Sequence, residues 1–500
     1  MSIRTILTEE INSLVSGNKI YEENRNRLQY LYESYMGGEV YRDGQHLTRY
    51  QLESAGEYSS RLQATPLDNH CQSVVSVFNS FLFREQPKRE YASLEGLSEV
   101  EAFIEDADLD GRSLNAFMKD VATWSSVFGH AWIIMAKPNT NSNTRAEELN
   151  QEVRPYVNLI TPLMMLDWSY ARSPNGAYRL DYIRYLEEVN GSVRTIKEWR
   201  PETIKTSIID VDQNTLTEEY EEINELGVIP AVCVYNKKST VRGFGISDLA
   251  DISDAQRMIY NLNSEIEQGI RLDGHPSLVK TPNTEAGAGA GAVIHMPEDL
   301  DPALKPYVLD HNGSNVDAIL KTKEALVDSI DKMANTGAVR ATESRTVSGV
   351  ALETEFTLLN ARLSEKSDNL ELAEEQMWRL FAQYQGYSWD GAIDYPDSFG
   401  IRDVSNDIRL MLETRKTLTD PKLITMFEYE IAEAHFGEEY MEGYDYEMAH
   451  PTLTEENRQP HIEAMIIEGY NDQQILDIHP ELSAEVLQSA KSKLLVQGQE

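Results

Sequence analysis

The feature that most restricts the fold of this chain is an apolar seam through residues 352–384. Its positions follow alternating steps of four and three, and they hold Leu352, Phe356, Leu359, Leu363, Lys366, Leu370, Ala373, Met377, Leu380 and Tyr384. This spacing places all ten side chains on one face of an α-helix. The seam therefore predicts one long packed helix over 348–385, which is interrupted only by the charge of Lys366.

Two shorter helical stripes precede the seam. The first covers 246–272, with Ser247 as its expected amino-terminal cap, and its apolar positions are Leu249, Ile252, Ala255, Ile259, Leu262, Ile266 and Ile270. The second covers 316–335, with Val316, Ile319, Leu326, Ile330 and Met333 on one face. Residues 276–315 between them are expected to be irregular. Residues 336–347 have no stripe and are expected to form a loop.

The pattern over residues 154–240 is that of strands. Alternating or β-branched runs are separated there by turn signals such as Asn190-Gly191, which predicts an antiparallel meander closed by the run at 231–236. Before these strands, the periodicity predicts helices at 18–36, 66–89 and 113–129, with an irregular segment after the first of them. A strand-like run follows the third helix, at 130–138. The expected fold class is α+β, mainly helical.

The part of the chain after the seam is also expected to be mainly helical. A short β-like patch at 393–401 comes first, and helices follow over 404–435. An acidic, tyrosine-rich joint spans 437–449. Two carboxy-terminal helices, at 453–470 and 471–496, complete the chain.

Composition excludes several classes of protein. A chain of 500 residues suggests about three structural units. Its 45 basic and 83 acidic residues give a net charge of −38, which repels nucleic acid and anionic membranes. Only two cysteines occur, so a disulfide-stapled or zinc-stapled fold is excluded. No run of about 18 apolar residues and no signal peptide are present, so we expect a chain made in the cytoplasm without a membrane span.

No catalytic motif is present. The chain lacks a phosphate-binding loop, an HExxH helix and a GxSxG elbow. Residues 106–111 (DADLDG) open like a calcium loop, but Phe117 stands where the twelfth-position Glu is needed. Residues 287–292 (GAGAGA) fit a dinucleotide fingerprint only superficially, because no strand precedes them and no helix follows. We therefore expect no enzyme activity, catalytic residue, metal or cofactor.

Three stretches resemble the portal proteins of tailed bacteriophages. Residues 243–249 (GFGISDL) look like the family's entry into its first stem helix, with Tyr260-Asn261 inside that helix. Residues 346–352 (TVSGVAL) look like the start of the family's long helix. Residues 78–87 (FNSFLFREQP) are similar to a segment near the family's amino terminus. The resemblance covers about residues 70–400.

The resemblance implies a portal-like organisation into wing, stem, clip and crown. The wing would comprise residues 1–240, with a return at 386–425, and the crown would comprise 426–500. The remaining parts would be the first stem helix 246–272, the clip 273–315, the second stem helix 316–335, the tunnel loop 336–347 and the long bridging helix 348–385.

The function implied by the resemblance is that of a portal in the virion. Twelve copies would form a ring at one capsid vertex, and double-stranded DNA would pass through its channel during packaging, retention and ejection. The partners would be terminase, then a head–tail adaptor or tail protein, together with the major capsid and scaffolding proteins. The excess of acid fits this role, because a basic channel would grip DNA by counterion release whereas an acidic channel lets it slide.

The same resemblance assigns roles to particular side chains. The tunnel loop would place Arg340 and Arg345 against DNA phosphates, flanked by Thr342, Ser344 and Thr346; the alternative is that the arginines pair with neighbouring acids. The clip would use Lys280 and His295 for partner contact. The polar faces of the stem would carry Asp248, Asp251, Asp254, Glu265 and Glu267, which are otherwise ordinary solvated charges.

Three other classes of function stay open, and one of them is a binding module of cellular origin, because a fold does not fix a function. An adaptor or scaffold-like oligomer of the virion would also have a long helical seam. A helical nuclease would need clustered carboxylates that hold a metal ion, whereas the acids of this sequence are dispersed.

Overall fold

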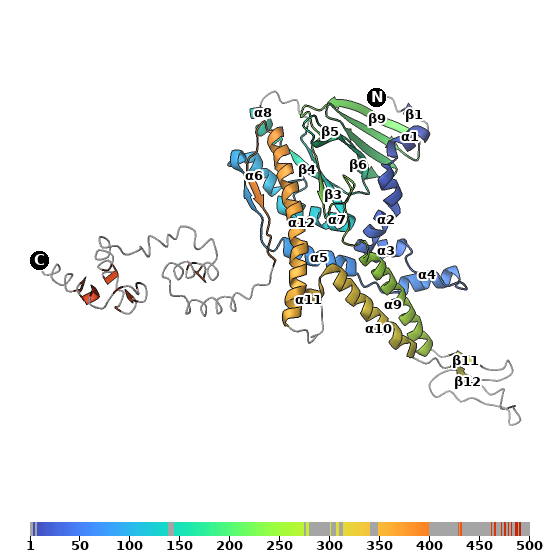
Figure 1. Ribbon diagram of the computed structural model, residues 1–500. Helices are drawn as coiled ribbons and strands as arrows, with labels where there is room; N and C mark the ends of the chain where they lie inside the picture. Colours follow the sequence, from blue (N-terminus) through green and yellow to red (C-terminus); the bar gives the residue numbers. More distant parts are fainter. Residues whose placement is uncertain are drawn as a thin grey trace. The chain divides into compact units, whose positions relative to one another are not determined.

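The computed structural model describes residues 4–5, 8–138, 145–274, 277–279, 301, 307–309, 314–340 and 349–399, together with scattered positions between 429 and 491. The chain divides into two compact units, Met1–Gly400 and Ile401–Glu500. The first unit is α+β, with antiparallel sheets and helices (Figure 1). In the second unit, the described side chains form a small apolar core of Ile462, Met465, Ile475, Leu482, Leu487 and Ala490.

For most of the second unit the expectations from the sequence stay predictions, because the structure describes few of its residues. The helices expected over 404–435 and the joint expected at 437–449 lie almost entirely outside the described residues. The same is true of most of the two helices expected at 453–470 and 471–496.

The amino-terminal part of the first unit contains more helix than predicted. Its helices are α1 Thr8–Val15, α2 Lys19–Met36, α3 Gly38–Asp43, α4 Ala55–Ala64, α5 His70–Leu82, α6 Ser98–Glu105 and α7 Leu114–Phe128. The helices predicted at 18–36 and 113–129 are confirmed as α2 and α7, and the one predicted at 66–89 is confirmed over the shorter range of α5. The expectation of an irregular segment after α2 is wrong, because α3 and α4 lie there. A capping box begins α4 there, in which Ser54 and Glu57 bond each other's backbone N–H groups.

Two antiparallel sheets account for most of the strands. The six-stranded sheet has the order β1-β9-β8-β7-β6-β5, and its strands are β1 Arg4–Thr5, β5 Met165–Arg172, β6 Tyr178–Asn190, β7 Val193–Trp199, β8 Thr203–Asp210 and β9 Thr215–Ile223. The three-stranded sheet has the order β10-β3-β4, with β3 His130–Ala136, β4 Tyr156–Ile160 and β10 Ala231–Tyr235.

The predicted meander is therefore correct only in part. Strands β5 to β9 pair consecutively as a meander, but the run predicted to close it, β10, pairs with β3 in the other sheet, as does β4. The reason lies in β3, which is buried at all seven positions. A wholly buried strand needs a neighbour on both edges to satisfy its backbone groups away from water, and β4 and β10 supply them.

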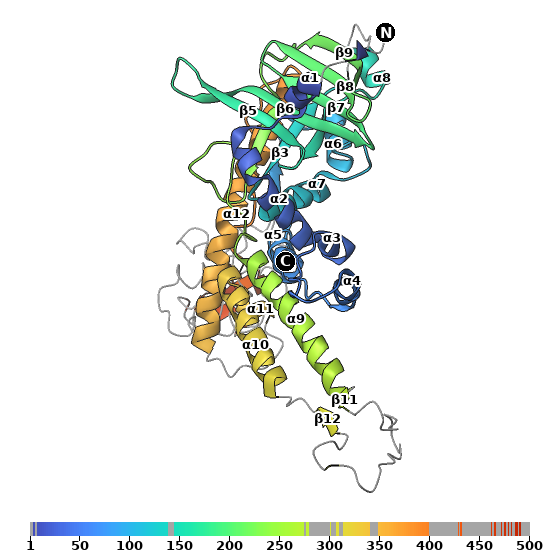
Figure 2. The ribbon, with the colours of Figure 1, turned by 90° about the vertical axis from the view of Figure 1, so that its right-hand side faces the viewer.

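An antiparallel pair of long helices, α9 Ile252–Gly274 and α10 Ser314–Ala334, follows the sheets. Figure 2 shows the two helices side by side, with a small strand pair at their far end. That pair joins β11 Ser277–Val279 to β12 Tyr307–Leu309, in the segment expected to be irregular. The stripe at 316–335 is confirmed as α10. The first helix begins at residue 252, five residues after the predicted cap Ser247.

The long helix predicted from the seam is confirmed as α12 Gly349–Tyr384. Its seam side chains from Leu359 to Met377 are buried, Lys366 included. The helix packs on β10 and β3, and its carboxy-terminal end places Trp378 in edge contact with Phe103 and Phe381. The β-like patch predicted at 393–401 is confirmed only at its start, where β13 Ala392–Asp394 pairs with β2 Lys88–Glu90.

The residues expected to form a loop after α10 contain a short helix. This helix, α11 Gly337–Arg340, covers four residues of the range 336–347. Thr336 begins it, because the Thr336 carbonyl accepts hydrogen bonds from the N–H groups of Val339 and Arg340. Residues 341–348 lie outside the described part of the chain.

Candidate functional site

The turn that precedes α9 is held by close backbone contact with the end of α7. Gly245 lies against Gly129, and a Cβ at Gly245 would overlap the carbonyl oxygen of Gly129. The Ser247 hydroxyl donates a hydrogen bond to the Val127 carbonyl, at 2.6 Å, and accepts one from the Leu249 N–H, at 2.9 Å. Ser247 therefore caps this turn and not α9, which explains why the helix starts later than its stripe predicts.

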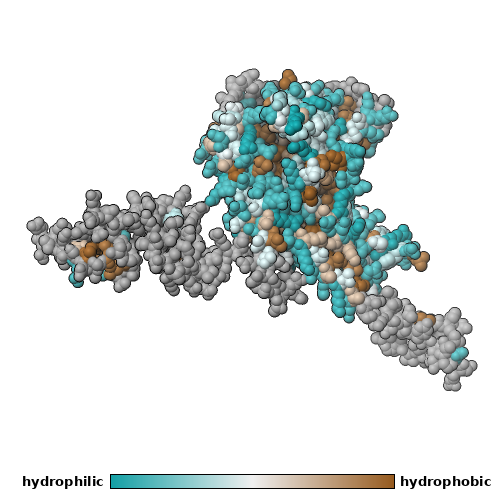
Figure 3. All heavy atoms as spheres, viewed as in Figure 1, coloured by the Kyte–Doolittle hydropathy of each residue, from teal (hydrophilic) through white to brown (hydrophobic). Residues whose placement is uncertain are grey.

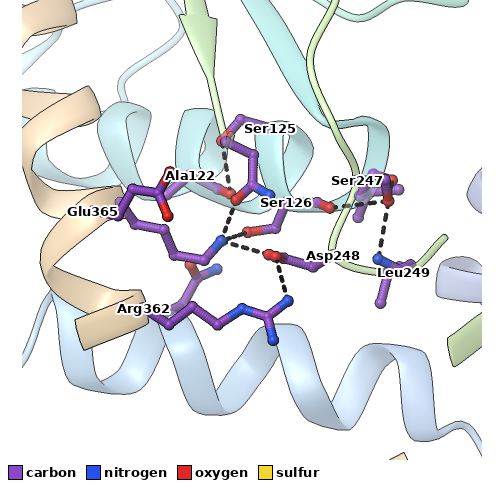
Figure 4. A network of polar contacts seen from close by, with 12 residues as sticks. Ala122, Ser125, Ser126, Ser247, Asp248, Leu249, Arg362 and Glu365 are labelled. Carbon is purple, nitrogen blue, oxygen red and sulfur yellow. Dashed lines mark hydrogen bonds and ion pairs between the residues drawn. The ribbon is translucent and has the colours of Figure 1, made fainter. Parts of the chain in front are cut away.

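The same turn places Asp248 against a buried lysine on α12. Lys366 Nζ contacts Asp248 Oδ2 and Asn236 Oδ1, and it lies 2.9 Å from Ser126 Oγ. The three acceptors come from the turn before α9, the end of β10 and α7. Figure 4 shows Asp248 and Ser126 facing each other in this network. Because an ammonium has three N–H donors, all the hydrogen-bonding capacity of Lys366 is used.

A second cation of α12 completes the network. Arg362 donates to Asp248 Oδ1 at 2.8 Å (Figure 4). It also donates to the Met333 carbonyl at 2.8 Å, so it joins α12 to α10 as well. Burial alone would raise the pKa of Asp248, but Lys366 and Arg362 outweigh it and hold that pKa at about 2. Burial lowers the pKa of Lys366, and Asp248 opposes this effect.

An open pocket of about 430 Å³ lies beside the network. Its lining includes Lys366 and Arg362 of the network, together with Lys237, Asn335 and Glu365. The pocket thus has charges of both signs at its wall, whereas the buried Lys366 and Asp248 neutralise each other. With the donors of Lys366 saturated, this arrangement provides a fixed joint between α7, β10, α9, α10 and α12 rather than a free acid, base or nucleophile.

Arg340 lies in a second buried cluster. Its guanidinium donates to Asp331 Oδ1 at 2.7 Å and to His70 Nδ1 at 2.8 Å. Arg340 and Asp331 are 11% and 12% exposed, so this arginine ties α11 to α10 and α5. The sequence analysis expected Arg340 to touch DNA from a loop, or else to pair with a neighbouring acid. In the structure Arg340 pairs with an acid, Asp331.

The predicted stem acids do not lie on one common face. Asp248 precedes α9, and its side chain is 5% exposed. Asp254 pairs with Arg27 of α2 at 3.2 Å, and Glu265 accepts a hydrogen bond from the Tyr50 hydroxyl at 2.7 Å. Glu267 pairs with Arg271 on its own helix, and Asp251 is exposed. Two of the five therefore fasten α9 to the amino-terminal segment of the same chain.

The other predicted site residues lie outside the described part of the chain. They are Thr342, Ser344, Arg345 and Thr346 of the expected tunnel loop, and Lys280 and His295 of the expected clip. The glycine run at 287–292 lies outside it as well.

The acidic loop at 106–111 uses its carboxylates for local contacts. Asp108 pairs with Arg112 at 2.6 Å, and Asp106 pairs with Arg154 at 3.2 Å. Phe117, at the twelfth position, is fully buried. Across the described residues, no group of three or more His, Cys, Asp or Glu could hold a metal ion. No helix in that part of the chain is long and apolar enough to cross a bilayer.

Sequence reasoning missed the role of Lys366, although its signal was visible. A lysine in a stripe that is otherwise apolar must be buried with an anion, and an aspartate at the start of the neighbouring stripe was a candidate. The pairing itself depends on tertiary structure. The Arg61 cluster was missed as well: Arg61 is buried and donates to Glu53 at 2.7 Å and to Ser264 of α9 at 2.9 Å.

Comparison with known proteins gives a remote likeness only. No protein-family model matches the chain, and no curated protein matches it. One solved structure, the neck of an empty gene transfer agent particle, has 9% identity and a TM-score of 0.44, over 79% of this chain and 99% of that chain. A chain from the virion of a native gene transfer agent particle has 10% identity and a TM-score of 0.41, over 80% of this chain and 99% of the other.

Proposed function

We propose that this chain is the subunit of a ring-shaped portal at one vertex of a phage capsid, through which double-stranded DNA passes during packaging, retention and ejection. The observation that carries the proposal is the antiparallel pair of α9 and α10, which ends in the short β11–β12 strand pair and is followed by α11 and the long helix α12. This order matches the stem, clip, stem, tunnel-loop and bridging-helix order that the sequence resemblance implies.

Exposed apolar side chains along the helix pair support assembly with further copies. Met258 and Ile270 of α9 are 49% and 59% exposed, and Leu320 and Met333 of α10 are 41% and 37% exposed. Figure 3 shows apolar surface over this helix pair among hydrophilic surroundings. A two-helix layer cannot bury all its apolar side chains alone, so exposed ones mark an interaction surface. Equivalent helix pairs from other copies would cover them and line a channel.

The charge of the chain supports passage of DNA rather than tight binding. Duplex DNA carries one negative charge per about 1.7 Å of axis, and tight binding needs basic groups that release its counterions. A ring of chains that each carry −38 lacks such groups in excess. In this proposal DNA slides past an acidic wall, and the segment after Arg340, which the sequence predicts to be a loop, would supply brief phosphate contacts from Arg345, beside Thr342, Ser344 and Thr346.

The buried joint then has a mechanical role. Asp248, Lys366 and Arg362 tie the start of α9 and the end of α10 to α12. A load on the helix pair would be transmitted to the sheets through these contacts and not through a flexible linker. Terminase, and later an adaptor or tail protein, would dock at the segment between α9 and α10, where Lys280 and His295 are the residues to test. Capsid and scaffolding proteins would hold the wing.

Electron micrographs of the purified full chain test the proposal. Closed rings with a central hole are the expected result. A two-fold dimer or tetramer would contradict it and favour the adaptor or scaffold-like alternative. Incubation with duplex DNA and magnesium or manganese tests the nuclease alternative, because DNA cleavage at the level of a metal nuclease contradicts the expectation of a protein without enzyme activity.

A further inference from the structure

One edge of the six-stranded sheet carries a basic surface in a strongly acidic chain. Residues 168–180, which include the β5–β6 turn, and residues 231–247, which include β10 and the loop after it, contain no Asp or Glu. Together they hold five basic residues, which we call the basic edge: Arg172, Arg179, Lys237, Lys238 and Arg242.

An exposed tyrosine brings the two segments together. The Tyr178 ring is contacted by Arg242, whose Cζ lies 3.9 Å from the ring centroid, and by Arg172 at 5.5 Å. Trp168 Nε1 donates to the Arg242 carbonyl at 3.0 Å, which fixes the loop against β5. Tyr178 is 45% exposed. Figure 2 shows the β5–β6 hairpin projecting beyond the rest of the sheet.

The basic edge has no anionic partner among the described residues. No ion pair within 4.0 Å joins any of its five cations to an acid in that part of the chain. Exposed arginine and tyrosine side chains of this kind are enriched at protein interfaces. The surface is thus suited to an acidic partner.

The opposite edge of the same sheet is acidic. Strand β9 carries Glu218, Glu219, Glu221 and Glu222, which we call the acidic edge, and no basic residue. All four are exposed, and among the described strands β1 covers this edge of β9 only at Thr215 and Leu216. Four strand spacings separate β9 from β5, or about 19 Å across the sheet.

We propose that the basic edge of one copy binds the acidic edge of the next copy, so that the sheets form a belt of charge contacts around the ring. This inference rests on the proposed function, because a ring requires a head-to-tail interface in which two different surfaces of each copy meet. Opposite edges of one sheet provide two such surfaces. Their complementary charges favour the correct encounter and oppose contact between like edges.

DNA is the other polyanion that a basic, aromatic surface fits. The acidic edge favours a second copy instead, since it supplies a matching surface at a fixed position in the same sheet. The charge of −38 also repels DNA at long range.

Charge reversal on the full-length chain tests the inference. Arg179 and Lys238 are exposed, and their reversal removes no hydrogen bond or ion pair between side chains of the described residues; the Lys238 ammonium lies 5.9 Å from the centre of the Tyr235 ring. We expect R179E/K238E, and separately E218K/E221K, to reduce ring association about tenfold or more, and the four substitutions together to restore it. Mass photometry over a protein dilution series measures the ring fraction. E95K/E101K is the matched control, because it changes two other exposed acids and should leave association unchanged.

The outcomes separate this inference from the proposed function. Rings formed equally well by the wild type and both reversed variants would overturn the inference and leave the ring intact. Failure of the wild type to form rings would contradict both the proposed function and this inference. Failure of the fourfold variant to recover, with each variant folded by circular dichroism, would also contradict direct contact between the edges. Unchanged rings with weaker binding of duplex DNA by R179E/K238E would show a nucleic-acid surface instead.

Discussion

Lys366 and Asp248 form an ion pair between α12 and the turn before α9, in which their side chains are only 6% and 5% exposed. Burial of both charges is costly, and the contacts of Lys366 with Ser126 and Asn236 offset part of that cost. The pair fixes where the first long helix starts relative to the longest helix of the chain.

Removal of the lysine charge should destabilise the protein strongly. Lys366→Met leaves Asp248 buried with Arg362 as its one remaining cation, and we expect a loss of about 3 kcal/mol in the free energy of unfolding. Urea unfolding followed by circular dichroism measures it. The control is Lys19→Met, which removes an exposed pair with Glu23 and should not move the midpoint. Equal losses of unfolding free energy from the two substitutions would show that the buried pair contributes no more to stability than an exposed pair.

The stability of the first unit should fall in acid because of His130. This residue is fully buried, contacts the Tyr21 hydroxyl and accepts a hydrogen bond from the Gly245 N–H at 3.3 Å. Burial lowers the pKa of His130 to about 3. The unfolded chain therefore binds a proton below its ordinary pKa of about 6.5 while the folded chain does not, so stability declines as pH falls from about 6.5 towards 3.

His130→Gln should make that decline shallower, because glutamine does not titrate. Thermal unfolding between pH 7 and pH 4 measures the difference in slope, which is at most about 1.4 kcal/mol per pH unit for one group. The low pKa of Asp248 adds a loss only below its ordinary range, as pH falls from about 4 towards 2. The prediction fails if wild type and variant have parallel profiles.

Gly245→Ala should be severely destabilising. A Cβ at this position would overlap the Gly129 carbonyl oxygen, so the backbone of one of the two segments must move. Overpacking of this kind costs about 3 kcal/mol, and a lower thermal unfolding midpoint measures it. Gly56→Ala in α4 is the matched control, since no atom lies within 4 Å of the added Cβ. A midpoint unchanged by Gly245→Ala would contradict the packing of the turn.

The two arginines near the predicted tunnel loop should behave differently. Arg340→Ala removes the contacts with Asp331 and His70, and we expect it to lower stability by about 2 kcal/mol, since it leaves a partly buried carboxylate unpaired. Arg345→Ala should leave stability unchanged and weaken salt-dependent DNA contact. Thermal unfolding and duplex-binding titrations measure the two effects. Equal stability losses would contradict the assignment.

Periodicity predicted the elements whose packing is repetitive. The seam predicted α12 almost to the residue because its apolar side chains recur at the spacing of one helix face over its whole length. The meander from β5 to β9 was predictable for the same reason, since consecutive strands joined by short turns pair with each other. Strand β10 could not be assigned this way, because its pairing with β3 joins residues about 100 positions apart and depends on which edges of β3 need cover.

The site was predictable only as a list of residue types. The stem acids were predicted as one set, but Asp248 differs from Asp251 because Lys366 and Arg362, each more than 100 positions away along the chain, contact it. The later start of α9 likewise follows from the hydrogen bonds by which Ser247 caps the turn before the helix. Sequence spacing contains no information on such contacts.

The mass of the assembled protein tests the central proposal most directly. Native mass spectrometry of the purified full chain, whose subunit mass is 56.8 kDa, gives the number of copies. The portal proposal predicts one dominant closed assembly of about twelve subunits, since a head-to-tail interface closes only at a set rotation. A stable assembly of two or four copies with two-fold symmetry would contradict it.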